Sequence, residues 1–151
     1  MFIYPENIEI LEHFHKRIIE LWLENWEWWS FWYLWWKDKS DLNSVIEFIK
    51  NDDYYKTFEE KLTHLVYAIN KNHIFADWNK RSSIYFWAYF LEINSLEFMV
   101  EKFLREMENI TVYVADNKIK KDLLQKIITS LIYEDDYSEE LKLEIYNSIN
   151  N

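Results

Sequence analysis

The sequence predicts an all-α protein, and three observations lead to that expectation. Apolar residues recur three and four positions apart over most of the chain, which is the spacing of a helix. Half of the residues are apolar and one fifth are aromatic, which favours a packed core over disorder. The 151 residues contain no linker and no internal repeat, so we expect residues 1–151 to form a single domain.

The first half of the chain contains three expected helices. Residues 5–21 form the first, and Pro5 suits its opening turn. A second helix begins at Ser40 or Asp41, since either side chain can cap it. The third covers residues 57–70. Its expected buried face consists of Phe58, Leu62, Leu65, Val66 and Ile69.

The second half begins with the most apolar helix. It is expected from about Asn79 to Leu91, and residues 84–91 are apolar without a break. Such a helix should be surrounded and central in the fold. Residues 98–107 suggest another helix. Residues 110–114 have strand propensity but also fit a helix.

Residues 116–133 are strongly periodic, and Ser138 can cap a last helix that reaches Ile149. We interpret residues 134–151 as a helical addition at the C-terminal end. Because the chain has no glycine and one proline, its turns must use asparagine and aspartate, which tolerate left-handed geometry. The expected turns lie at residues 51–53, 71–72, 94–95, 116–117 and 134–136.

Seven of the nine tryptophans lie within residues 22–36. Their spacing fits a helix in part, but residues 26–36 also fit a short β-hairpin. Some of these rings can be core, because large aromatic side chains dominate buried area. Seven rings so close in sequence cannot all face inward, so we also expect an exposed aromatic patch that binds a partner. The candidates for that patch are Trp26, Trp28, Trp29 and Trp32.

Composition excludes several classes of function. The net charge is −10, whereas a nucleic-acid-binding protein needs a basic face, and an acidic chain is not attracted to an anionic membrane. The absence of cysteine excludes disulfides and thiolate zinc sites. No apolar stretch is long enough to span a bilayer, and the first residues do not resemble a signal peptide. A cytoplasmic location is therefore expected.

The most informative segment, residues 73–81, reads His-Ile-Phe-Ala-Asp-Trp-Asn-Lys-Arg. A histidine can take a proton from a hydroxyl group, and a carboxylate four residues later can hold Mg²⁺. The cations that follow, and free N–H groups at the start of a helix, can bind phosphate oxygens. This combination is suited to phosphate chemistry.

The string His-x-Phe-x-Asp-x-Asn-Lys-Arg closely resembles the signature of the Fic/Doc family, in the form carried by the Doc ("death on curing") toxins. The likeness extends from about Pro5 to Ile132, but residues 73–81 are its specific part. It implies the all-α Fic/Doc helical fold, with the central buried helix after the motif loop. It also implies that residues 22–36 form a flap that holds the target peptide beside the active site.

The resemblance assigns a role to each motif residue. His73 is the general base, and Phe75 is a buried anchor of the loop. Asp77 is the Mg²⁺ ligand, acting through the nucleotide phosphates. Three further residues bind the phosphate groups of ATP: Asn79, Lys80 and Arg81.

Two positions separate the Doc branch from the Fic proteins that transfer AMP. Those proteins carry glycine where this chain has Lys80 and a second arginine where it has Ile84. The Doc form implies phosphorylation of a protein Ser/Thr hydroxyl by ATP. Its expected target is a threonine of the elongation factor that delivers aminoacyl-tRNA. Its expected inhibitor is a small Phd-like antitoxin.

Two alternatives remain open from the sequence. The first is a Fic-type enzyme that transfers AMP or another nucleotidyl group to a protein. The second is a catalytically inactive module that binds partners through the tryptophan-rich segment. Trp78 keeps the second alternative open, because a small residue is usual at that position and tryptophan can block the pocket.

Other patterns carry less weight. Ser130 and Glu134 have the spacing of the inhibitory Ser/Thr-x-x-x-Glu helix of some Fic proteins. His13 and His15 are two residues apart, so they do not share a helix face and do not indicate a metal site. His64 is expected on the solvated flank of its helix.

Overall fold

The computed structural model describes residues 2–4, 44–71, 87–88 and 90–151. Within these ranges every regular element is a helix, and no strand occurs. The main elements are α3 (Phe58–Lys71), η2 (Glu97–Met99), α5 (Val100–Ala115), α6 (Lys121–Tyr133) and α7 (Glu139–Ile149). Residues 44–49, 87–88 and 90–93 are also helical. The predicted all-α class is thus confirmed. The predicted helix over residues 5–21 and the hairpin over residues 26–36 lie outside the described residues.

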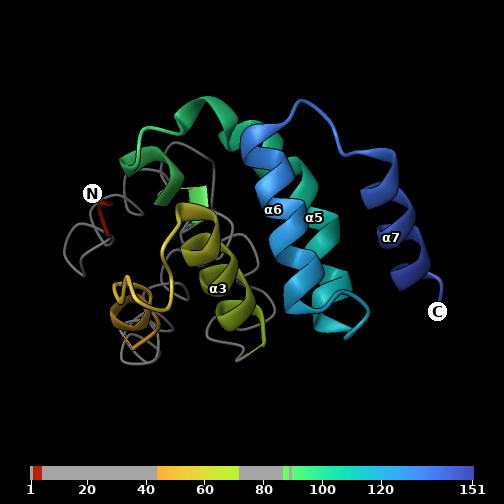
Figure 1. The fold of residues 1–151 in the computed structure, drawn as a ribbon, viewed down its shortest axis with the longest axis horizontal. Coiled ribbons are helices and arrows are strands. Elements are labelled where there is room, and N and C mark those ends of the chain that lie inside the picture. The colour runs from red at the N-terminus through yellow and green to blue at the C-terminus, as the bar shows by residue number, and fades with distance from the viewer. Residues whose placement is uncertain (1, 5–43, 72–86, 89) are drawn as a thin grey trace, which may run out of the picture.

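Helices α5 and α6 lie side by side, with α3 on one side of them and α7 on the other (Figure 1). Among the described helices, α3 packs most extensively against α6 and less extensively against α5. One continuous apolar core joins these helices with residues 44–49 and the helical residues of 87–93. The apolar face predicted for α3 is confirmed, since all five of its residues are buried: Phe58, Leu62, Leu65, Val66 and Ile69.

The helix that follows the motif is buried where it is described. Trp87, Ala88, Phe90 and Leu91 are all core residues, which agrees with the predicted central helix. The ring of Phe90 packs on that of Phe58 with a centroid distance of 5.0 Å. Phe58 lies in the first turn of α3 and Phe90 near the end of the later helix, which is the pairing that two antiparallel helices produce.

Residues 110–114 belong to α5, although their strand propensity left the sequence ambiguous. They continue a helical row of buried residues, because Phe103, Met107, Ile110 and Val114 recur at three- and four-residue spacing. The packing of this row in the core favours a helix, and it outweighs the strand propensity of the β-branched residues. Phe98, in contrast, stands before α5 in η2 and is 76% exposed.

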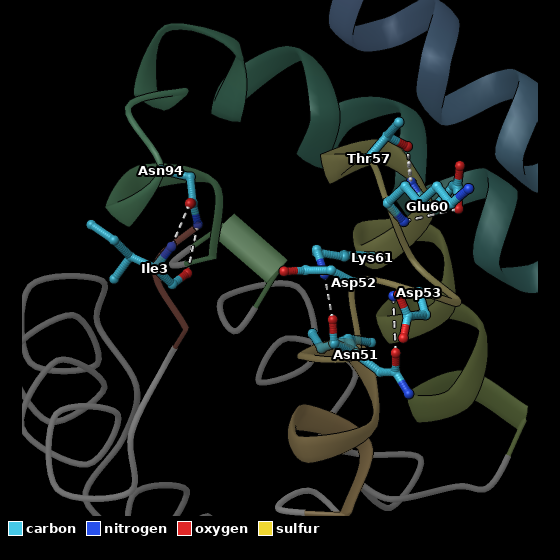
Figure 2. A network of polar contacts seen from close by, with 10 residues as sticks. Ile3, Asn51, Asp52, Asp53, Thr57, Glu60, Lys61 and Asn94 are labelled. Carbon is cyan, nitrogen blue, oxygen red and sulfur yellow. Dashed lines mark hydrogen bonds and ion pairs between the residues drawn. The ribbon is translucent and has the colours of Figure 1, made fainter. Parts of the chain in front are cut away.

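Two of the predicted turns use left-handed backbone at residues other than glycine. Asn117 has φ of 63° at the turn predicted for residues 116–117. At residues 94–95 the left-handed residue is Ser95, with φ of 65°. Asn94 instead uses its side chain, which bonds both the N–H and the carbonyl of Ile3 (Figure 2). The same side chain also donates to the carbonyl of Phe90. The first described residues are thereby held against the end of the central helix.

The periodic pattern predicted a helix from residue 116, but α6 begins five residues later, at Lys121. The turn at residues 116–117 separates α5 from α6. Ile119 lies in the connection after this turn, and its side chain is buried in the core. Lys102 of α5 stabilises the connection between α6 and α7. Its ammonium donates to the backbone carbonyls of Glu134 at 3.1 Å and Asp135 at 2.8 Å.

Ser138 caps α7 as predicted: its hydroxyl oxygen accepts a hydrogen bond from the backbone N–H of Leu141 at 3.1 Å. Ser138→Ala should destabilise α7 by about 1 kcal/mol, since one N–H of the first turn loses its acceptor. The Leu141 amide should then exchange with deuterium faster. Ser138→Asp is the matched control, because aspartate is an equally good cap. Unchanged exchange in the alanine variant would contradict the capping role.

Candidate functional site

The motif itself lies outside the described residues. This holds for His73, Phe75, Asp77, Asn79, Lys80 and Arg81, as well as for Trp78, Ile84 and the patch candidates Trp26, Trp28, Trp29 and Trp32. The structure does describe both flanks of the motif. Helix α3 ends at Lys71, two residues before His73, and the next described helical residues begin at Trp87. Residues on both flanks belong to the same apolar core.

A buried lysine fixes the start of α3. The side chain of Lys61 is 0% exposed, and its ammonium donates to the Ile49 carbonyl at 2.6 Å. It also donates to Asp52 at 2.8 Å (Figure 2). The ammonium also lies 5.5 Å from the ring centroids of both Phe2 and Tyr4. These contacts join three segments that are distant in sequence.

Burial acts to lower the pKa of the Lys61 ammonium, but the interactions with Asp52 and Tyr4 outweigh burial, so this pKa is raised. The lysine is therefore charged and paired at neutral pH. Lys61 lies three residues after Phe58 and four before Leu65, on the apolar face of α3. That position is the only sign of its burial that the sequence contains.

The prediction that His64 is solvated is wrong. His64 is half-buried between α3 and α6. Its Nδ1 lies 2.9 Å from the ammonium of Lys121 and 3.1 Å from the hydroxyl of Tyr55. The ring also packs on Tyr55 and Phe48, with centroid distances of 4.8 and 5.3 Å. Residues distant in sequence bury this histidine, so helical spacing alone could not reveal it.

The contacts of His64 define its protonation state. An ammonium can only donate, so Nδ1 must present its lone pair to Lys121, and the ring hydrogen is then on Nε2. Burial, with a second contribution from the charge of Lys121, lowers the pKa of His64 to about 4. His64 is therefore neutral at physiological pH.

This low pKa predicts a loss of stability in mild acid. An unfolded histidine takes up a proton near pH 6.5, whereas the folded His64 resists protonation until about pH 4. The stabilisation is complete above pH 6.5 and is lost as the pH falls to 4. The loss should be on the order of 2 kcal/mol after an allowance for solvent screening. His64→Phe keeps a ring but cannot titrate.

Urea unfolding of wild type and His64→Phe at several pH values measures this effect. The other acid-titrating groups are common to both proteins, so the difference between them isolates His64. Parallel stability curves between pH 7 and 4 would contradict the assigned pKa.

Ser130 and Glu134 lie at the end of α6. Ser130 is buried, and its hydroxyl has no hydrogen-bond partner among the residues that the structure describes. Glu134 is exposed just after the helix, where its N–H donates to the Ser130 carbonyl at 2.8 Å. Both residues line a groove of about 600 Å³ between α6 and α7. An inhibitory role for this pair stays a prediction.

The described residues contain no group of three or more side chains able to hold a metal ion. Asp77, the predicted Mg²⁺ ligand, is outside them. Of the helices that the structure describes, none is both long enough and apolar enough to cross a bilayer.

Residues 35–91 match the model of the Fic/DOC family. The match covers less than half of the chain and includes the helical residues 44–49, α3, the motif, and the described residues up to Leu91. These residues are therefore similar to the Fic/DOC family, and the match does not resolve the Doc branch. Searches of curated proteins and of solved structures gave no match. Fic/DOC proteins are typically transferases that act on proteins, and they generally use a nucleotide with Mg²⁺.

Proposed function

We propose that this chain is a Doc-like transferase that phosphorylates a Ser/Thr hydroxyl of a protein with ATP and Mg²⁺. The observation that carries the proposal is the family match over residues 35–91, because it contains the complete motif of residues 73–81. The all-helical fold and the burial of both motif flanks support it. We also propose that residues 1–151 form one domain, with residues 134–151 as a C-terminal addition.

In the proposed reaction, His73 takes the proton from the target hydroxyl, and the hydroxyl oxygen attacks the γ-phosphorus of ATP. The bond to the β-phosphate oxygen breaks and ADP leaves. Asp77 would hold Mg²⁺, which neutralises charge on the phosphates. Lys80 and Arg81 would stabilise the negative charge on the phosphoryl oxygens during transfer. Asn79 would bind the phosphate groups with Lys80 and Arg81, and Phe75 would anchor the loop.

Two residues favour transfer of the γ-phosphate over transfer of AMP. Lysine at position 80 hinders the close backbone approach to phosphate that glycine permits. Isoleucine at position 84 supplies no cation for the placement that AMP transfer uses. Incubation of the protein and a target with ATP labelled on the α- or the γ-phosphate distinguishes the reactions. Label from the γ-phosphate supports the proposal, and label from the α-phosphate supports AMP transfer.

The proposed partners follow from the Doc resemblance. The target is a bacterial elongation factor that delivers aminoacyl-tRNA, modified on a threonine. The inhibitor is a small Phd-like antitoxin whose tail folds on the toxin. Trp26, Trp28, Trp29 and Trp32 are the candidates for the surface that holds the target.

A second candidate function rests on Trp78. A tryptophan where a small residue is usual can close the nucleotide site, which would leave a partner-binding module without activity. ATP binding separates the two functions, because a closed site binds no nucleotide.

Nucleotide binding should depend on Asp77 and Arg81 in different ways. Asp77→Ala should weaken ATP binding only when Mg²⁺ is present, because it removes the metal ligand. Arg81→Ala should weaken binding with and without Mg²⁺, by about tenfold, because it removes a direct phosphate contact. Isothermal titration calorimetry in both conditions measures this. Unchanged ATP affinity in both variants would show that the motif has only a structural role.

A further inference from the structure

We propose that α7 is a detachable helix, which leaves α6 as one unit while α3, α5 and α6 stay folded. Opening uncovers the side of α6 that carries Ser130, so the two states give α6 two different surfaces. The proposal rests on the packing of α7 and does not depend on the chemistry of the motif. Helix α7 lies at the edge of the described fold, beside α6 (Figure 1).

Few buried contacts hold α7 in place. Of the eleven residues that the structure describes in this helix, Leu141 alone is buried. Ile145 is partly buried against the same core, whereas Leu143 and Tyr146 are 60% and 64% exposed. In α6, by comparison, six residues are buried. The hydrophobic contribution to the docking of α7 therefore comes mainly from one leucine side chain.

The polar contacts between α6 and α7 are weak. Lys126 of α6 donates to both carboxylate oxygens of Glu144, at 2.9 and 3.2 Å. The two side chains are 59% and 42% exposed, so water screens this ion pair and it contributes little to docking. The groove between the helices is also lined by three further carboxylates: Asp122, Glu134 and Glu140. Like charges on both sides of the groove disfavour close packing.

Ser130 adds a cost to the docked state. Its side chain is 3% exposed, and its hydroxyl has no hydrogen-bond partner within the described part of the chain. Ser130 lines the groove together with Leu141, and it lies beside a smaller space that Tyr137 lines. When α7 leaves, the hydroxyl can bond to water. Opening therefore recovers the desolvation cost of a buried, unpaired polar group.

The contacts of the connection before α7 place the hinge after Tyr137. Lys102 of α5 holds the carbonyls of Glu134 and Asp135, and the hydroxyl of Tyr137 donates to Glu106 of α5 at 3.2 Å. Beyond this point, a helix of eleven residues is too short to be stable alone in water. Detachment and unwinding therefore occur together, and α7 opens as one unit instead of fraying from its C-terminal end.

A single cysteine at position 130 tests the opening, because the chain has no cysteine of its own. The thiol of Ser130→Cys reacts with iodoacetamide only when α7 has left it. Val66→Cys is the matched control, since Val66 is fully buried on α3. Each rate is divided by that of the same variant in urea, and urea unfolding corrects for differences in global stability. Ser130→Cys should react at least about tenfold faster than Val66→Cys, because local opening costs less than global unfolding. A smaller ratio would overturn the proposal.

Two substitutions in the Ser130→Cys protein test what holds α7. Leu141→Ala should raise the rate of thiol labelling at least about tenfold, because it removes a buried side chain from the docked state. Leu143→Ala makes the same change on the exposed side of the helix, so it should alter the rate by less than about twofold. Equal effects of the two substitutions would overturn the proposal.

Hydrogen exchange of the wild-type protein decides the question if the cysteine variants do not fold. The amide of Lys142 bonds to the Ser138 carbonyl at 2.9 Å, in the first turn of α7. If α7 opens as one unit, this amide should exchange at least about tenfold faster than the core amides of α3, after correction for intrinsic rates. Protection at Lys142 as strong as in α3 would show that only the end of α7 frays, and it would overturn the proposal.

Discussion

His73→Ala should lower the rate of phosphoryl transfer by about 10²–10⁴, because the target hydroxyl would lose the proposed general base. ATP affinity should change little, since the proposed phosphate contacts come from Lys80 and Arg81 and from the metal held by Asp77. Single-turnover transfer and calorimetry on the same preparation separate these two quantities.

The matched control for this prediction is His64→Asn. It also removes a histidine, but one that lies between α3 and α6 and contacts Lys121 and Tyr55. Transfer by this variant should stay within about threefold of wild type, as for a residue without a role in the chemistry. Full activity of His73→Ala would exclude His73 as the general base.

Phe90→Ala should destabilise the fold by about 3–5 kcal/mol, because it leaves a cavity in the centre of the core. Phe90 is fully buried, and its ring packs on Phe58 and on Tyr4 at centroid distances of 5.0 and 6.2 Å. It also lies on the helix that follows the motif, so the substitution should weaken nucleotide binding as well as lower the stability of the fold. Urea unfolding measures the loss.

Phe98→Ala is the control, since Phe98 is eight residues away and 76% exposed. It should change the free energy of unfolding by less than about 0.5 kcal/mol. Equal effects of the two substitutions would show that the helix after the motif is not the centre of the core.

The helical class, the buried face of α3 and the Ser138 cap were predictable, because each is encoded by local periodicity or by a single capping side chain. The start of α6 was predicted less accurately. A periodic apolar pattern continues through the turn at residues 116–117, where Ile119 is buried outside the helix. Local spacing does not show that Asn117 adopts left-handed backbone there.

The polar residues of the core were not predictable, because their partners are distant in sequence. His64 is buried by Lys121, which lies 57 residues later. Lys61 is satisfied by the Ile49 carbonyl and by Asp52, neither of which shares its helix. For the motif, the sequence is more informative than the structure. The identities of residues 73–81 indicate their chemistry, whereas these residues lie outside the described part of the fold.

The central claim is that the His73 site transfers the γ-phosphate of ATP to a protein hydroxyl. Mass spectrometry tests it most directly, on proteins from bacterial cells that express either the wild-type chain or His73→Ala. Phosphate and AMP add different masses, so the adduct identifies the reaction. We predict a phosphate adduct on a Ser or Thr of a target protein with wild type, and its loss with His73→Ala. An AMP adduct made by wild type, or the same phosphate adduct with His73→Ala, would contradict the claim.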